Sequence, residues 1–257
     1  MQLLTKKMIS RLLSVLQLAA ENPGTVAAKL RGADARVYAL LSRPWLKQLQ
    51  VNTVLDVGAN VGHWAKACRL ALPDVFISSF EPIPECQNAL SQQMANDPKH
   101  TIFPYALGRT RSELKLHLHS HAASSSLLTA TKDFKGISNG SVAVRELPVS
   151  VETLDNIARE NRWPGPYLLK LDVQGYELEV LRGAASVLPK TALIIAETSF
   201  RPLYQEQAIF GDIHRHLTEA GFSYCGAAES VLRLSSGLEV QQDSLFVRND
   251  LMQHLAW

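Results

Sequence analysis

Short apolar runs alternate with amphipathic segments from residue 51 onward, and this alternation dominates the hydrophobic pattern of the chain. The apolar and β-branched runs predict strands at 53–57, 75–80, 101–105, 167–171 and 192–196. Apolar positions at helical spacing predict helices over 62–72, 84–94, 153–160 and 209–220, with a further helix beginning near Tyr176. Strands that alternate with helices favour a mainly parallel sheet covered on both faces.

Weaker patterns complete this α/β, doubly wound domain. Leu114, Leu116 and Leu118 alternate with polar residues, which predicts an edge or inserted strand, and another strand is expected near 142–149. Residues 121–140 are rich in Ser and Thr and lack periodicity, so we interpret them as a loop that serves as a lid. Segments 223–225 and 244–247 predict a hairpin-like antiparallel pair at the edge of the sheet.

The first 50 residues have a pattern of their own. Ile9, Leu12, Leu13 and Leu16 fall at helical spacing, which predicts an amphipathic helix. Polar residues interrupt the apolar run, and no segment of the chain reaches the roughly 18–20 apolar residues of a membrane span. We interpret 1–50 as an N-terminal helical extension, ending near the helix breaker Pro44, and 51–257 as one ligand-binding domain. The helix would pack on its own domain or form a homodimer contact, and binding to a membrane surface is the alternative.

Composition narrows the class of protein without naming it. The chain has 257 residues, 46% of them hydrophobic, which is enough for one substantial core. Its 26 Lys and Arg nearly balance 24 Asp and Glu, so overall charge gives no reason to expect a nucleic acid partner. The three cysteines have neither metal-ligand spacing nor the density of a disulfide framework. We therefore expect a cytoplasmic protein with reduced, mostly buried thiols.

The strongest motif is the segment VLDVGANVG at 54–62, where a strand ends in Asp56 and turns into a helix. Gly58 and Gly62 allow a sharp turn and a close approach of the backbone to a ligand, and Asn60 tolerates unusual backbone geometry. Asp56 can accept hydrogen bonds from a ligand or pair with its amine. The third glycine of the dinucleotide fingerprint is missing, which favours a cofactor without phosphates over NAD.

Glu81 ends the next strand, 25 positions after Asp56, in the segment Phe-Glu-Pro. The carboxyl ends of neighbouring strands in a doubly wound sheet line one ligand crevice. A carboxylate at that edge can accept hydrogen bonds from both hydroxyls of a ribose. Helix capping for Asp56 and a solvated strand end for Glu81 are the structural alternatives for each residue alone, and their combination favours a nucleoside cofactor.

Several ordered segments resemble the FkbM-type methyltransferases. They are DVGANVG (56–62), FEPIP (80–84), YALG (105–108), SSSLL (124–128), VETLD (151–155), LKLDVQGYELEVLRGA (169–184) and AETS (196–199). The resemblance covers about 53–247. It implies a class I methyltransferase with a Rossmann-like, seven-stranded sheet, S-adenosylmethionine as cofactor, and O-methylation of a hydroxyl on a sugar or natural product.

Ala106, in the YALG segment of the resemblance, is a candidate cofactor contact. Ser125 lies in the predicted lid, where its hydroxyl could donate a hydrogen bond to the methyl donor or to the acceptor, and ordinary loop solvation is the equal alternative. Gln174 departs from the family, which commonly has an acidic residue at this position. If that acid acts as a base or metal ligand in relatives, its role is unfilled in this chain.

Methyl transfer is an in-line displacement in which a base can remove the acceptor proton. Asp172 and Glu197 each follow an apolar strand, so both are candidate catalytic residues, with Asp172 preferred and helix capping as its alternative role. The two carboxylates could also hold Mg²⁺, which the sequence leaves open but does not favour. His117, His119 and His121 repeat at every second position, for which an exposed strand face is a simpler interpretation than a metal site.

Two other functions compete with a methyltransferase that acts on a small hydroxylated acceptor. One is an NAD-dependent oxidoreductase, which the missing glycine disfavours. The other is a non-catalytic ligand-binding or scaffold protein of the same fold. A nucleic-acid methyltransferase is disfavoured as well, because the chain has no basic tract interleaved with aromatic residues.

Overall fold

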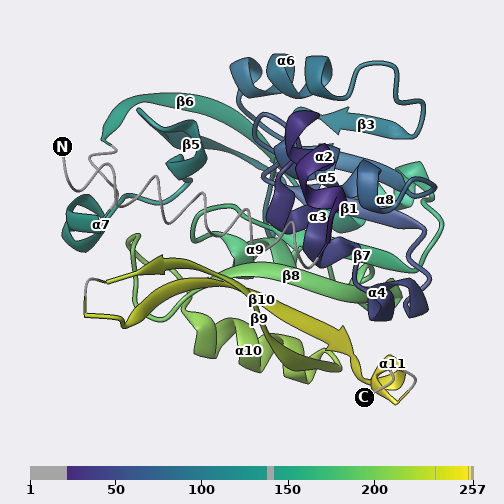
Figure 1. The fold of residues 1–257 in the computed structure, drawn as a ribbon. Helices are drawn as coiled ribbons and strands as arrows, with labels where there is room; N and C mark the ends of the chain where they lie inside the picture. Colours follow the sequence, from purple (N-terminus) through teal and green to yellow (C-terminus); the bar gives the residue numbers. More distant parts are fainter. Residues whose placement is uncertain (1–21, 138–141, 235, 254, 256–257) are drawn as a thin grey trace.

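A seven-stranded sheet forms the centre of the computed structural model (Figure 1). The strand order is β3-β2-β1-β7-β8-β10-β9, with β10 antiparallel to both of its neighbours and the other pairs parallel. The strands are β1 (Thr53–Val57), β2 (Phe76–Phe80), β3 (His100–Phe103), β7 (Tyr167–Leu171), β8 (Thr191–Ser199), β9 (Phe222–Arg233) and β10 (Glu239–Arg248). The predicted Rossmann-like, doubly wound α/β fold is confirmed. The structure describes residues 22–137, 142–234, 236–253 and 255.

The order of the strands places a switch point between β1 and β7. The chain passes from β1 outward through β2 and β3, and later returns to β7 on the other side of β1. Because helices then cover opposite faces, a crevice opens outside the carboxyl ends of these two strands. The fold therefore positions a ligand site at the ends of β1, β2 and β7.

Alternate strand residues face two separate cores, as in a sheet buried on both sides. Val54, Leu168 and Leu193 belong to one core, which they share with side chains of α5 (His63–Ala71) and α6 (Pro84–Gln93). Their sequence neighbours Leu55, Leu169 and Ile194 belong to the other core, with α8 (Leu154–Asn161), α9 (Glu177–Arg182) and α10 (Phe210–Glu219).

Three short helices precede the first strand: α2 (Gly24–Leu30), α3 (Ala35–Leu41) and α4 (Pro44–Gln48). Leu41 and Leu46 are buried in the same core as α5, so this part of the extension packs on the domain. Pro44 was expected to break a helix, but it occupies the first turn of α4, where a missing N–H costs nothing. The amphipathic helix predicted over the first residues lies outside the described part of the chain, and so does any dimer contact through it.

A second, three-stranded sheet has the order β4-β6-β5. It comprises β4 (Ala106–Leu107), β5 (Ser112–His119) and β6 (Ala143–Glu152), and it buries Leu116, Leu118 and Val149 in a core of its own. The alternating leucines therefore belong to an inserted sheet and not to an edge of the main one. His119 is buried against Phe134, with ring centroids 5.4 Å apart, so the expectation that it lies on an exposed strand face is wrong.

Two further expectations need correction. The segment from 121 onward is not entirely loop, because it contains a 3₁₀ turn, η1 (Ala122–Ser124), and a helix, α7 (Lys132–Ile137). The late strand pair is also much longer than predicted, with 12 residues in β9 and 10 in β10. Its mixture of polar and small residues gives no strand periodicity. The length of the pair comes from pairing of β9 with β10, and β10 pairs with β8 as well.

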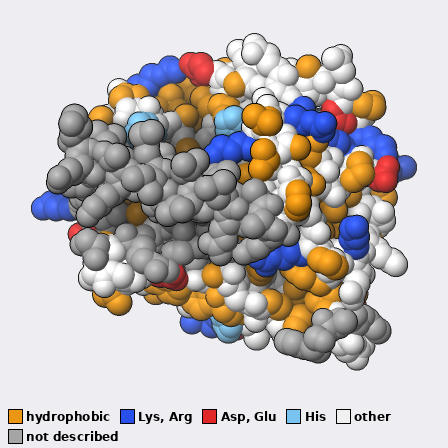
Figure 2. All heavy atoms as spheres, viewed as in Figure 1, with side chains coloured by type: hydrophobic (Ala, Val, Ile, Leu, Met, Phe, Trp, Pro, Cys, Tyr) orange, Lys and Arg blue, Asp and Glu red, His pale blue; other side chains and the backbone are white. Residues whose placement is uncertain are grey.

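The outer surface of the described residues is mixed in character. Lys and Arg side chains appear across the right-hand half of the face in Figure 2, the half on which Figure 1 shows α8. A 3₁₀ turn, η2 (Leu188–Lys190), and a short helix, α11 (Asn249–Met252), complete the elements. Among the described residues no helix combines the length and apolar character that crossing a bilayer requires.

Candidate functional site

The turn after β1 brings two strand ends into direct contact. Gly58 has a φ of +76°, and a Cβ added there would lie 1.9 Å from the carbonyl oxygen of Asp172. Asn60 also has a left-handed backbone, with a φ of +48°. A glycine at position 58 is therefore required for both its conformation and the close approach of the β1 and β7 ends.

Glu81 follows β2 and is buried, with 4% of its surface exposed. Its Oε2 accepts a hydrogen bond from the Asn60 amide at 2.8 Å, and its Oε1 accepts one from the Ile83 amide at 2.8 Å. Burial raises the pKa of this carboxyl to about 7, although the two amide donors oppose the shift. Glu81 thus fixes the turn after β1 while its carboxylate faces the pocket.

A buried ion pair lies beneath the turn. The Lys170 ammonium is 3.1 Å from Asp56 Oδ1 and donates to the Gly58 carbonyl oxygen at 2.7 Å. Ser79 Oγ donates to the other oxygen of Asp56 at 3.3 Å. Burial disfavours the Lys170 ammonium, but the Asp56 and Asp172 carboxylates outweigh it, so the Lys170 pKa is raised. The side chain of Asp56 is fully buried, and its interactions are with the protein.

Asp172 follows β7, and its side chain is 42% exposed at the pocket. Its Oδ1 accepts a hydrogen bond from Gln174 Nε2 at 2.8 Å, and Lys170 Nζ is 3.8 Å from Oδ2. Gln174 has a left-handed backbone, with a φ of +55°, which turns its side chain back toward the strand ends. The carboxylate is therefore held in place while remaining accessible.

Glu197 lies inside β8, which continues to Ser199, so the prediction that it ends its strand is wrong. The Gln174 amide also donates to Glu197 Oε2 at 2.5 Å, and the Tyr204 hydroxyl donates to Gln174 Oε1 at 3.0 Å. Burial and the nearby carboxylates of Asp172 and Asp243 raise the pKa of Glu197. Gln174 thereby bridges the buried carboxyl of Glu197 and the exposed carboxyl of Asp172 through hydrogen bonds.

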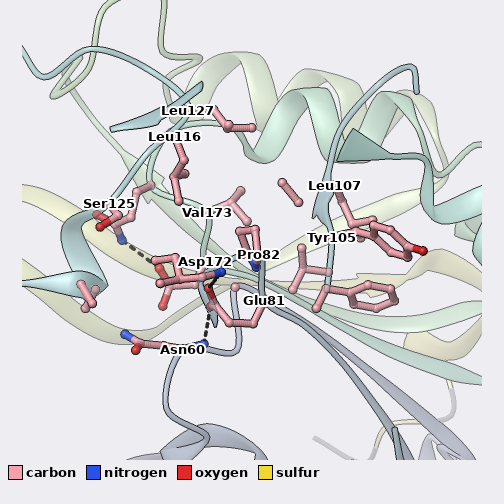
Figure 3. Close-up of a pocket in the computed structure, with 18 residues that line it drawn as sticks. Asn60, Glu81, Pro82, Tyr105, Leu107, Leu116, Ser125, Leu127, Asp172 and Val173 are labelled. Atoms are coloured by element: carbon pink, nitrogen blue, oxygen red, sulfur yellow. Dashed lines mark hydrogen bonds between the residues drawn. The ribbon is translucent and has the colours of Figure 1, made fainter. Parts of the chain in front are cut away.

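These strand ends form one side of a pocket, and the inserted sheet forms the other (Figure 3). Asn60, Glu81 and Asp172 face Leu116 and Leu127 across it. The volume is only about 80 Å³, below the few hundred Å³ of usual small-molecule sites. A nucleoside-sized ligand therefore requires the walls to separate, and the η1 side is the more exposed wall.

The structure brings together most of the residues proposed from sequence. Gly58, Asn60, Glu81, Ala106, Ser125 and Asp172 all line the pocket. Three others lie outside its lining. Asp56 lies beneath the turn, paired with Lys170. Gly62 packs against Leu90, so closely that an added Cβ would lie 2.6 Å from the Leu90 side chain. Glu197 is connected to the pocket through its hydrogen bond with Gln174.

Sequence reasoning did not place the apolar walls or the Gln174 contacts. Phe80, Tyr105, Leu107, Leu116, Leu127 and Val173 line the pocket. Leu107 and Leu116 belong to the inserted sheet, so their proximity to the strand ends depends on its position, which no local pattern reveals. Tyr204 is 30 residues from Gln174 in sequence, so its hydrogen bond also arises only from the tertiary fold.

The hydrogen-bond acceptors of the site suit a ligand that carries hydroxyl and amine groups. It offers carboxylate acceptors on Glu81 and Asp172 beside aromatic and aliphatic walls. Within the described part of the chain, no group of three or more His, Cys, Asp or Glu side chains is arranged to hold a metal ion.

The fold and this pocket define a class of protein: a doubly wound α/β domain with a pocket at the switch point of the sheet. Residues 56–224 match the family model described as the methyltransferase FkbM domain, and the chain belongs to this family of methyltransferases. The predicted family membership is confirmed.

Two characterised relatives are similar over part of their length. The hexuronic acid methyltransferase AglP of Haloferax volcanii is 28% identical over 153 residues, which are 59% of this chain and 58% of the relative. The 2-O-methyltransferase NoeI of Sinorhizobium fredii is 28% identical over 160 residues, 60% of this chain and 66% of the relative. The chain thus matches less than two thirds of the length of each.

Among solved structures, an O-methyltransferase family protein from Burkholderia thailandensis aligns with a TM-score of 0.43 and 11% identity. The alignment covers 82% of this chain and 55% of that one.

Proposed function

We propose that the chain transfers a methyl group from S-adenosylmethionine to a hydroxyl group of a sugar or natural product. Membership of the FkbM family supports methyl transfer. The name of AglP indicates a hexuronic acid acceptor for that relative, and the name of NoeI indicates O-methylation for the other. The observation that carries the proposal is the pocket at the β1–β7 switch point, with Glu81 at the end of β2 and Asp172 at the end of β7, on either side of β1.

Glu81 is the proposed contact to the ribose of the donor. Each of its oxygens accepts one backbone amide and retains a lone pair that a hydroxyl can use. Ala106 and Ser125 line the same pocket, and the Gly58–Asn60 turn presents backbone without a bulky side chain. Asp56 contributes indirectly, by holding Lys170 against the Gly58 carbonyl. When bound, the donor supplies an electrophilic methyl group on its sulfonium.

Asp172 is the proposed base. Its carboxylate is the more exposed of the two candidate acids, and Gln174 orients one oxygen through a 2.8 Å hydrogen bond. Asp172 would accept the proton of the acceptor hydroxyl as the hydroxyl oxygen displaces the sulfonium sulfur from the methyl carbon in line, so that the bond from carbon to sulfur breaks as the bond from carbon to oxygen forms. Glu197 would act as a positioning residue through Gln174, because it is buried and outside the pocket lining.

The experiment is an assay with trideuteromethyl-labelled donor and a panel of hexuronic acids, neutral sugars and phenolic natural products. Label should appear on oxygen in at least one hydroxylated acceptor, detected by mass spectrometry. Asp172→Asn should lower kcat on that acceptor by about 100-fold, the usual minimum effect of a general base, with donor affinity changed less than about threefold.

Glu113→Gln is the matched control, since this exposed residue on β5 lies away from the pocket lining. Wild-type turnover by Asp172→Asn would contradict the assignment of the base. Donor binding with no turnover on any hydroxylated acceptor would instead favour the non-catalytic alternative.

A further inference from the structure

A second recess lies on the helical face formed by α8 and α9, with a volume of about 780 Å³. Small-molecule pockets usually fall between about 300 and 1,000 Å³. Its floor includes buried Tyr167 and Val187 and half-buried Trp163. The recess has sufficient volume for a small molecule, and the proposed methyl transfer does not use it.

Positive charge is concentrated in its walls. Five cationic side chains line the recess: Arg109, Arg159, Arg162, Arg182 and Lys190. All five are exposed, whereas Asp155 is the single acidic residue in the lining. The whole chain carries a formal net charge of only +2, so this excess is local to the recess.

The single carboxylate is already engaged. Asp155 Oδ1 accepts hydrogen bonds from the Ser186 amide at 2.9 Å and the Val187 amide at 3.2 Å. These bonds tie α8 to the segment that leads into η2 and so form part of the recess floor. Asp155 therefore accepts hydrogen bonds from the backbone. Among the described residues it forms no hydrogen bond or ion pair with the surrounding cationic side chains.

Local helix chemistry explains only some of the cations. Arg159 and Arg182 lie in the last turns of α8 and α9, where positive charge is favourable, and Arg182 pairs with Glu179. Arg109 and Lys190 belong to neither helix. Over the part of the chain that the structure describes, neither has a side-chain hydrogen bond or ion pair, which leaves both cations available to a ligand.

A close contact between Gly183 and Gly108 places Arg109 at the recess. At Gly183, after α9, a Cβ would lie 2.1 Å from the Gly108 carbonyl oxygen and 3.4 Å from Arg109 Cα. Only a residue without a side chain lets these two segments touch, which places Arg109 beside the end of α9. The convergence of cations from three separate segments is thus built into the packing.

We propose that this recess binds a phosphorylated small molecule of the nucleoside diphosphate class. Arginine side chains recognise phosphate oxygens through paired N–H donors, and clustered cations compensate the charge of a diphosphate. Trp163 is held by edge-on contacts with Phe80 and Phe103, at centroid distances of 6.2 and 5.8 Å, and offers an aromatic surface for a base or sugar.

The shape of the recess distinguishes this ligand from a nucleic acid. The cations surround a hollow with an apolar floor, whereas a nucleic acid requires a basic surface that follows its backbone. Phe80 lines the first pocket and contacts Trp163, which lines the second. The two cavities are therefore neighbours, but no described residue lines both of them.

The test is calorimetric titration of the full chain with uridine diphosphate and, separately, inorganic pyrophosphate. Both should bind saturably at one site, and saturating S-adenosylhomocysteine should leave their affinity unchanged. The variant Arg109→Gln/Lys190→Gln should weaken binding of uridine diphosphate at least tenfold, since it removes two cations that can donate charge-assisted hydrogen bonds to phosphate oxygens.

The matched control is Arg31→Gln/Lys47→Gln, which removes the same net charge from two exposed positions, one directly after α2 and one in α4, and should change affinity less than twofold. If the control variant weakened binding of uridine diphosphate equally, the effect would be due to the overall charge of the chain, and the proposal would be overturned. Competition by S-adenosylhomocysteine would assign the ligand to the first pocket instead. Binding of an RNA oligonucleotide with no binding of either phosphate probe would overturn the small-molecule assignment.

Discussion

At the scale of single residues, Gln174 decides how the acids of the site interact. Its amide nitrogen contacts both Asp172 and Glu197, and its amide oxygen accepts from Tyr204. A neutral donor between two carboxyls relieves repulsion that two close negative charges would otherwise experience. An acid at this position would add a third carboxyl group to the same small volume.

Replacing Gln174 with Glu tests this interpretation at nearly constant shape. A carboxyl among other carboxyls has a raised pKa, so the variant should lose stability as pH rises and this group ionises. With EDTA present to remove divalent ions, we expect a melting temperature near wild type at pH 5 and several °C lower at pH 8. Gln205→Glu, at an exposed position, is the control. An unaltered melting temperature at pH 8 would show that Gln174 does not separate the acids.

The sequence identified individual acids better than their partners. Asp172 and Glu81 were predictable because each directly follows an apolar strand, and strand ends in this fold meet at one edge. The burial of Asp56 was not predictable, since it depends on Lys170 from a neighbouring strand. Likewise, Gln174 could be recognised as unusual in sequence, but its contacts depend on a left-handed backbone and on Tyr204.

At the scale of elements, the turn between β1 and α5 determines whether the pocket can form. Gly58→Ala would introduce both a strained φ and a clash with the Asp172 carbonyl oxygen. We expect a loss of about 3 kcal/mol in the free energy of unfolding, from left-handed strain plus overpacking. Chemical denaturation of the two proteins measures it.

Gly221 provides the matched control for the strain alone. Its φ is +89°, but nothing lies within 4 Å of an added Cβ. Gly221→Ala should therefore cost about 1–2 kcal/mol, the strain without the clash. Equal losses in the two variants would mean that the contact between the β1 and β7 ends adds nothing to stability.

Element boundaries were predictable where hydrophobic periodicity is local. The predicted limits of β1 and β7 agree with the structure because both are short, fully buried runs between turns. The lengths of β9 and β10 were not predictable from the sequence. Their polar residues are held in strands because β9 pairs with β10 and β10 also pairs with β8. The inserted sheet was seen only as isolated strands, since its pairings join residues far apart in sequence.

At the scale of the whole molecule, several buried acids make stability depend on pH. Burial raises the pKa of Glu81, Glu177 and Asp243 to about 7, and it raises that of Glu197 as well. The folded state therefore holds more protons than the unfolded state between about pH 4.5 and 7. Stability contributed by these groups is present at low pH and is lost as pH rises through that window.

We expect the melting temperature to fall by an amount on the order of 5 °C between pH 5.5 and 8. Burial lowers the pKa of His100 and His216, which opposes the trend, but the four acids outnumber them. Differential scanning fluorimetry across this range measures the change. Glu177→Gln should reduce the slope, whereas Glu85→Gln, at an exposed position, should not. A melting temperature that rises from pH 5.5 to 8 would contradict the assignment of these buried acids.

The central claim is that the switch-point pocket binds the methyl donor through Glu81. The most direct test is calorimetric titration of S-adenosylhomocysteine into the wild-type chain and into Glu81→Ala, with NAD as the comparison ligand. We predict saturable binding of S-adenosylhomocysteine, no binding of NAD, and at least a tenfold loss in the variant, since hydrogen bonds to a charged group contribute about 1.5–3 kcal/mol. Binding of NAD alone, or equal affinity in the folded variant, would contradict the claim.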